Sequence, residues 1–197
     1  MYEIPTSVLI EDKSYAIRNQ GDFRMVLDCF AALEDTSLNP NERRVACLII
    51  FYEDFNEVED VARTPRETLE QLMLGMFKFM NCGKSREELG AKQPFHLLDW
   101  EKDSQLVCSA VNKVAGMEIR SCSYLHWWTF MGYYLAIGES ALATVISIRS
   151  KIARNKPLEK FEKEFRRENP QFFNMDYRTQ QDREEDELIK QLWNSGK

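Results

Sequence analysis

The chain has few of the residue types from which catalytic and metal sites are built. It contains only two histidines, His96 and His126, and they lack the H-x-x-x-H spacing that puts two metal ligands on one helical face. No G-x-S-x-G, P-loop or G-x-G-x-x-G pattern occurs. Acidic pairs such as Glu87 and Glu88 lie in highly charged stretches, which favours a solvated surface over acid–base chemistry. The sequence therefore predicts a protein that is not an enzyme and uses no cofactor or metal.

Cysteine pairing is absent as well. The five cysteines form no C-x-x-C pair and their number is odd, which argues against both a disulfide framework and a structural zinc site. Residues 1–5 have neither the basic start nor the apolar stretch of a signal peptide. Together these features predict a protein of a reducing cytoplasm.

Neither a membrane span nor a nucleic-acid surface is favoured. The apolar stretch 124–148 is long enough to cross a bilayer, but it contains Glu139, whose charge would be costly in hydrocarbon. The net charge is −6, yet the segment 149–167 carries +5 and the rest of the chain −11. Three glutamates within that basic segment argue against phosphate binding. A solvated helix with ion pairs, or a docking surface for an acidic partner helix, fits it better.

Glycine and proline are scarce, at 8 and 6 residues, which disfavours long loops, and 44% hydrophobic residues are enough for a core. Periodicity predicts a mainly helical fold with a short N-terminal β-hairpin and a charged C-terminal helical tail. We expect one domain over 1–168 and an extension over 169–197. The expected helices cover 23–33, 42–52, 65–80, 98–114, 124–135, 141–148 and 157–168, with a surface connection over 53–63. Asp22 is expected to cap the helix over 23–33, and Thr64 and Glu67 are expected to form a capping box.

The run 124–135 is apolar on every side, which is typical of a buried central helix. Its aromatic residues could also form a base-stacking surface or a patch for a protein partner, but core packing is favoured. Trp127 and Trp128 point about 100° apart on a helix, so one of them can reach a surface groove. His126 is expected to be a hydrogen-bonded core histidine.

Several segments together resemble a known family. They are Gly21-Asp22-Phe23-Arg24 after the hairpin, Phe95–Trp100, His126–Phe130, Val145–Arg149 and the lysine-rich Lys151–Phe165. In order and spacing they resemble a family encoded in the tail gene cluster of siphophages and prophages of Gram-positive hosts, just upstream of the tape-measure gene. The resemblance covers residues 5–34 and 95–168.

The resemblance implies a tail assembly chaperone in the bacterial host cytoplasm. Such a protein would cover the apolar stripes of the helical tape-measure protein and leave as tail-tube subunits polymerise. The alternative is a structural head–tail or tail component that stays in the particle. A homo-oligomer is compatible with an assembly factor but is not encoded in the residue pattern. The expected partner contacts are Trp128, Tyr133, Arg149, Lys151, Lys160 and Lys163.

Overall fold

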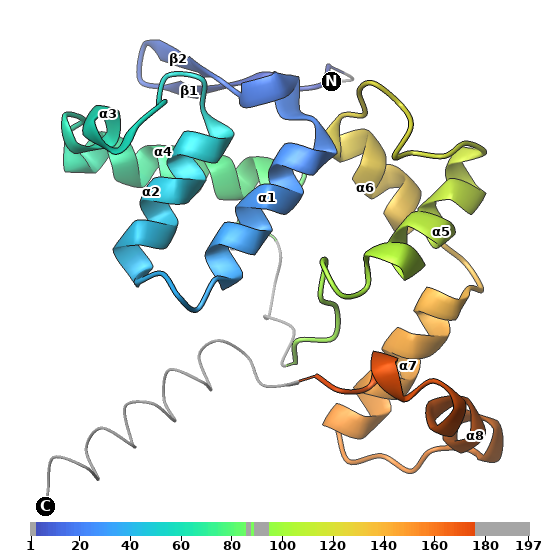
Figure 1. Ribbon diagram of the computed structural model, residues 1–197. Helices are drawn as coiled ribbons and strands as arrows, with labels where there is room; N and C mark the ends of the chain where they lie inside the picture. Colours follow the sequence, from blue (N-terminus) through green and yellow to red (C-terminus); the bar gives the residue numbers. More distant parts are fainter. Residues whose placement is uncertain (1–2, 86–87, 89–94, 176–197) are drawn as a thin grey trace, which may run out of the picture. The chain divides into compact units, whose positions relative to one another are not determined.

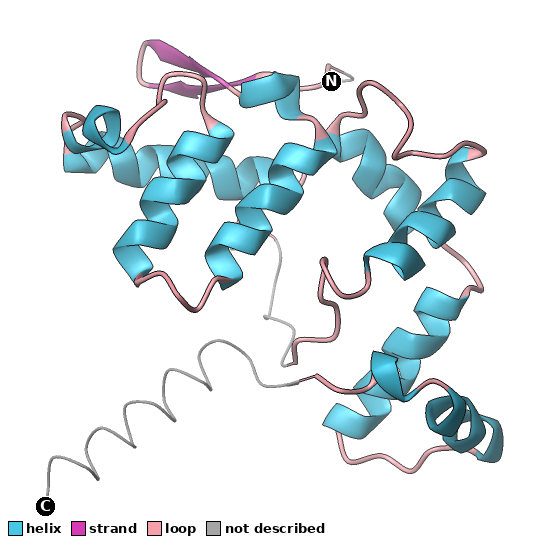
Figure 2. Cartoon of the chain, viewed as in Figure 1, coloured by secondary structure: helices cyan, strands magenta, loops and turns pink. Residues whose placement is uncertain are grey.

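The computed structural model describes residues 3–85, 88 and 95–175 (Figure 1). These residues form a mainly helical structure with an antiparallel N-terminal hairpin, which confirms the predicted fold class (Figure 2). The elements are β1 (Ser7–Ile10), β2 (Lys13–Ala16), η1 (Arg18–Gly21), α1 (Phe23–Glu34), α2 (Pro40–Phe51), α3 (Val58–Ala62), α4 (Arg66–Met80), α5 (Ser104–Ala115), α6 (Trp127–Leu135), α7 (Ala141–Ala153), α8 (Lys160–Glu168) and η2 (Pro170–Phe172). The predicted tail helix lies outside the described residues.

The contacts within the chain divide it into two compact units. Unit 1 comprises Met1–Gly90 and Val111–Ile137, and unit 2 comprises Ala91–Ala110 and Gly138–Lys197. Helix α5 begins in unit 2 and ends in unit 1. The predicted division at residue 168 stays a prediction, although η2, just beyond it, packs with the core of unit 2.

The hairpin of unit 1 has the expected place and pairing. Its strands pair from Ser7 with Ala16 to Ile10 with Lys13, and Glu11 takes a positive φ of 52° in the turn. Strand β1 packs on α4 where Gly75 leaves room for it. A Cβ at Gly75 would lie 2.5 Å from a methyl carbon of Val8, so only glycine permits this approach without a shift.

Helix starts in unit 1 follow local capping, in part where it was expected. The carboxylate of Asp22 accepts a hydrogen bond from the backbone N–H of Arg24 and caps α1, as predicted. Helix α2 begins two residues earlier than expected, because Asn39 forms a capping box. The predicted capping box at Thr64 is wrong. Thr64 instead donates its hydroxyl proton to the carbonyl of Asp60, and α4 begins at Arg66 without a side-chain cap.

Further elements also differ from the prediction. The expected surface connection over 53–63 contains α3 and two buried side chains, Phe55 and Val61. Helix α5 begins at Ser104, because the Asp99 carboxylate accepts the backbone N–H groups of residues 101 and 102 in a preceding turn. Helix α8 begins at Lys160, after a capping box between Glu159 and Glu162.

Unit 2 has a small core. Val145 and Ile148 of α7 and Phe173 after η2 are buried in it. Five partly buried hydrophobic side chains pack around these three: Leu106, Ile152, Leu158, Phe165 and Phe172. The core thus joins α7, the inner side of α8 and the segment after it.

Candidate functional site

The aromatic run of α6 provides the centre of unit 1. Trp127 is 1% exposed, its ring stacks on Phe130, and its indole N–H donates to the backbone carbonyl of Met80 over 2.8 Å. Phe130 in turn stacks on Phe23 of α1 with ring centroids 4.9 Å apart. The prediction of core packing is therefore confirmed for Trp127 and Phe130.

His126 is the buried, hydrogen-bonded histidine that was expected. Its Nδ1 accepts the backbone N–H of Trp128 over 3.0 Å and caps α6. Its Nε2 lies 3.1 Å from the carbonyl oxygen of Pro5. Both contacts are satisfied by the neutral tautomer with the proton on Nε2. Burial lowers the pKa of His126, which favours the same neutral form.

The rest of the run is more exposed than predicted. Leu135 is 75% exposed, and Tyr124, which lies before the helix, is 45% exposed, so the prediction of a helix buried on every side is wrong. Trp128 is half-buried and donates its indole N–H to the carbonyl of Phe79 over 2.9 Å. Tyr133 is also half-buried. These two expected contact residues thus border the surface of unit 1.

Arg149 lies in the core of unit 2 rather than on a surface. Its guanidinium forms a two-armed ion pair with Asp103, at 2.5 and 2.8 Å, and the two side chains are 3% and 1% exposed. Further donors reach the carbonyl oxygens of Leu97 and Phe172. The prediction that Arg149 contacts a partner directly is therefore corrected. The side chain is buried and joins three segments of its own unit.

Lys151 is occupied within the chain as well. Its ammonium group donates to Glu162 over 2.6 Å and lies 3.7 Å from Glu159. The hydrogen bond from Lys151 lowers the pKa of Glu162, and the same bond raises the pKa of Lys151. Glu162 also accepts the backbone N–H of Glu159. Lys151 thus holds the start of α8 against α7.

Lys160 and Lys163 share an exposed side of α8. With Arg167 they follow spacings of three and four residues, which places them on one helical face, and Arg166 borders it. We call these four residues the basic face of α8. Arg167 pairs with Glu164, whereas the described residues offer no ion-pair partner to Lys160, Lys163 or Arg166. Phe161 is 57% exposed and lies about 100° around the helix from Lys160.

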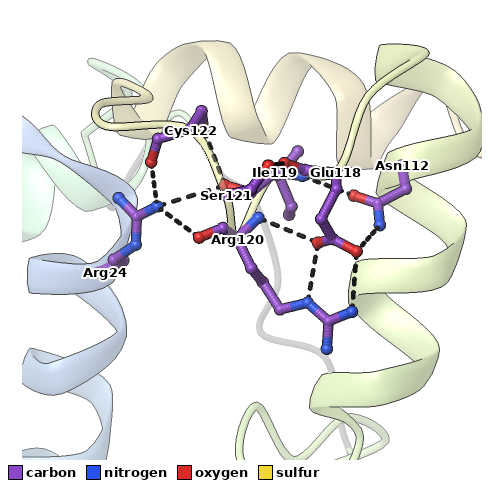
Figure 3. A network of polar contacts seen from close by, with 7 residues as sticks. All are labelled: Arg24, Asn112, Glu118, Ile119, Arg120, Ser121 and Cys122. Atoms are coloured by element: carbon purple, nitrogen blue, oxygen red, sulfur yellow. Dashed lines mark hydrogen bonds and ion pairs between the residues drawn. The ribbon is translucent and has the colours of Figure 1, made fainter.

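Figure 3 shows a polar network that was not predicted. Arg24, already paired with Asp22, donates to the carbonyl oxygens of Ile119 and Cys122. The carboxylate of Glu118 binds the guanidinium of Arg120 nearby. The network fixes the segment that leads to α6. Because Arg24 and Cys122 are 98 positions apart, no local pattern could reveal the contact.

No other chemical centre emerges from the described part of the chain. Within residues 3–85, 88 and 95–175, no group of three or more His, Cys, Asp or Glu side chains could hold a metal ion. All five cysteines are free thiols, of which Cys29 and Cys47 are buried. None of the described helices combines the length and the apolar character of a membrane span.

Comparison with models of known protein families identifies the family of this chain. The model of a family described as "Bacteriophage Gp15 protein" matches residues 1–173. The chain belongs to the bacteriophage Gp15 family. Membership in the Gp15 family confirms the phage part of the resemblance noted in the sequence. No curated protein and no solved structure matches the chain.

Proposed function

We propose that this Gp15-family protein is a non-catalytic tail assembly chaperone that binds the helical tape-measure protein and keeps it soluble until tail-tube subunits polymerise around it. Family membership supports a role in a bacteriophage. The resemblance to tail-cluster proteins supports the tape-measure partner. The single structural observation behind the proposal is the basic face of α8, on a helix that also exposes Phe161.

The composition of this surface suits an amphipathic helical partner. Lys160 and Lys163 carry charges that have no ion-pair partner in the described chain, so acidic side chains of a helix can approach them. Phe161 adds an apolar contact, and more than half of its surface is exposed. A long helical protein with apolar stripes and acidic flanks would meet both features.

The same surface suits a contact that must be released. Exposed ion pairs contribute about 0–1 kcal/mol each and weaken as salt screens them. A chaperone built on such pairs can hold a partner through many weak contacts and lose it when a stronger assembly competes. Lys151 is bound to Glu162, so in this proposal it positions α8 and does not contact the partner.

The test is co-expression with the tape-measure protein of the same phage, followed by a solubility assay and pull-down. We expect a soluble, captured partner, and we expect Lys160→Glu plus Lys163→Glu to reduce capture without unfolding the chain. Arg44→Glu plus Lys84→Glu is the matched control, because it makes the same charge change at two exposed residues of unit 1. Capture that survives reversal of the basic face, or falls equally in the control, would remove α8 from the interface.

A second measurement separates the chaperone from a structural head–tail or tail component. A chaperone leaves before the particle is complete, so purified particles should lack the protein. Its recovery from particles at a fixed ratio to the tail proteins would instead identify a component of the particle. Light scattering of the purified chain would test the expected homo-oligomer.

A further inference from the structure

The outer edge of β1 leaves backbone groups unpaired. Ile17 donates its N–H to the carbonyl of Thr6 over 2.8 Å, which makes Thr6 and Ile17 a hydrogen-bonded pair of the hairpin. In an antiparallel ladder hydrogen-bonded and non-hydrogen-bonded pairs alternate. With the observed register, Ser7 and Leu9 therefore belong to non-hydrogen-bonded pairs. Their N–H and C=O groups point away from β2, and no hydrogen bond joins them to the described residues.

The two edges of the hairpin differ in this respect. On the outer edge of β2, the carbonyl of Ala16 accepts the N–H of Glu53, and Ile17 forms a bridge with Tyr52. That edge is therefore partly covered by the chain that follows α2. The edge of β1 is the one that remains able to pair with another strand.

A groove of about 680 Å³ lies beside this open edge, between β1 and α4. Three of the four residues of β1, Val8 to Ile10, line it together with Glu11. Leu74 and Gly75 of α4 lie on its other side. Leu9 and Leu74 are 71% and 61% exposed, so the groove offers apolar contacts next to unpaired backbone groups.

The charges around the groove select its occupant. Three glutamates, Glu11, Glu67 and Glu70, line it against one cation, Lys78. Glu70 is paired with Arg66, whereas no ion pair is found for Glu11 or Glu67 in the described chain. A basic segment is therefore favoured over an acidic one.

We propose that this groove binds an extended segment of a partner protein as an added strand beside β1. In that segment hydrophobic residues alternate with lysine or arginine. The backbone of Ser7 and Leu9 supplies the pairing, the apolar side chains of the groove take every second residue, and Glu11 and Glu67 face the cations. The preference is opposite in charge to that of the basic face of α8, so this site is additional to the proposed function and independent of it.

The test uses a fluorescein-labelled octapeptide of alternating valine and lysine, titrated into the full chain by fluorescence anisotropy. Leu9→Pro removes the outward N–H but no bond of the hairpin. We expect it to weaken binding by about tenfold, as the loss of one well-formed hydrogen bond implies. The matched variant Leu9→Ala keeps the N–H and loses only part of the apolar contact, so it should weaken binding by less than Leu9→Pro does.

Two further probes keep the proposal falsifiable if Leu9→Pro disturbs the hairpin. A peptide methylated at every backbone nitrogen should lose binding to the wild-type chain, because neither of its edges can donate a hydrogen bond to β1. Glu11→Lys plus Glu67→Lys should weaken the lysine peptide and strengthen a valine–glutamate peptide. No saturable binding of the lysine peptide, or equal binding of the methylated peptide, would overturn the proposal. These outcomes leave the tape-measure test unaffected.

Discussion

The two units of this protein stabilise their interiors in different ways. Unit 1 has an aromatic core, in which Trp127, Phe130 and Phe23 stack in series. Unit 2 has a small core beside a buried ion pair between Arg149 and Asp103. Aromatic burial stabilises in proportion to the area removed from water. A buried ion pair is sensitive to the loss of either partner, because the remaining charge is then left unpaired.

The largest effect is expected where the aromatic core of unit 1 is emptied. Trp127→Ala removes a buried ring and leaves the carbonyl of Met80 without its indole donor. We expect the free energy of unfolding to fall by about 3–5 kcal/mol. Denaturant unfolding measures the loss, and hydrogen exchange by mass spectrometry should place it in the peptides of unit 1.

The neighbouring residue gives the control for this substitution. Trp128 has the same chemistry but is half-buried, so Trp128→Ala should destabilise by clearly less than Trp127→Ala. Equal losses for the two variants, or a loss spread evenly over both units, would contradict the assignment of Trp127 to the centre of unit 1.

The ion pair of unit 2 should respond nearly as strongly to a far smaller change. Asp103→Asn keeps the shape of the side chain but leaves the buried guanidinium of Arg149 without a counter-charge. We expect a loss of about 3 kcal/mol, with reduced exchange protection in unit 2. In the double variant Asp103→Leu plus Arg149→Met both charges are removed, and we expect it to unfold less readily than Asp103→Asn. If the double variant has a lower free energy of unfolding than Asp103→Asn, the ion pair itself stabilises the unit.

Local sequence patterns predicted the helices and strands of unit 1 well. They did not predict the long-range contacts that hold distant segments together in either unit. The hairpin, the Asp22 cap of α1 and the burial of Trp127 all rest on residues that are close together in the chain. Short-range periodicity and capping chemistry therefore carry the information. The fold class followed from these signals.

The contacts that failed to show in the sequence join distant residues. Arg149 and Asp103 are 46 positions apart, and a basic segment rich in exposed cations gave no sign that one of them is buried. Lys151 belongs to the same segment but is engaged by Glu162. Of the four cations predicted as partner contacts, only Lys160 and Lys163 are exposed, because charge composition does not reveal which side of a helix faces its own core.

The pH dependence of unit 1 should come in part from His126. Its pKa is lowered from the ordinary 6.5 by burial, so the unfolded chain binds the proton more readily than the folded one. The stabilising contribution is therefore complete above about pH 6.5 and decreases as the pH falls through the lowered pKa. His126→Asn keeps a cap for α6 but should lose this dependence. His126→Ala loses the cap as well, at a cost of about 1 kcal/mol. Thermal melts between pH 7 and pH 5 compare the three chains.

The smallest effect is expected at the ion pair that joins α7 and α8. Glu162→Gln keeps an acceptor for the backbone N–H of Glu159 but loses the charge that binds Lys151. Because Lys151 is partly open to solvent, we expect a loss of no more than about 1 kcal/mol at neutral pH.

Acid should abolish the difference between this variant and the wild-type chain. The pKa of Glu162 is lowered in the folded state, so its contribution is present above the ordinary value of 4.5 and is lost as the pH falls through the lowered value. Melts of both chains at neutral pH and below pH 4 measure it. If Glu162→Gln is as harmful in acid as at neutral pH, the loss does not come from the charge that binds Lys151. The contrast between the units would then lie in the buried Arg149–Asp103 pair alone.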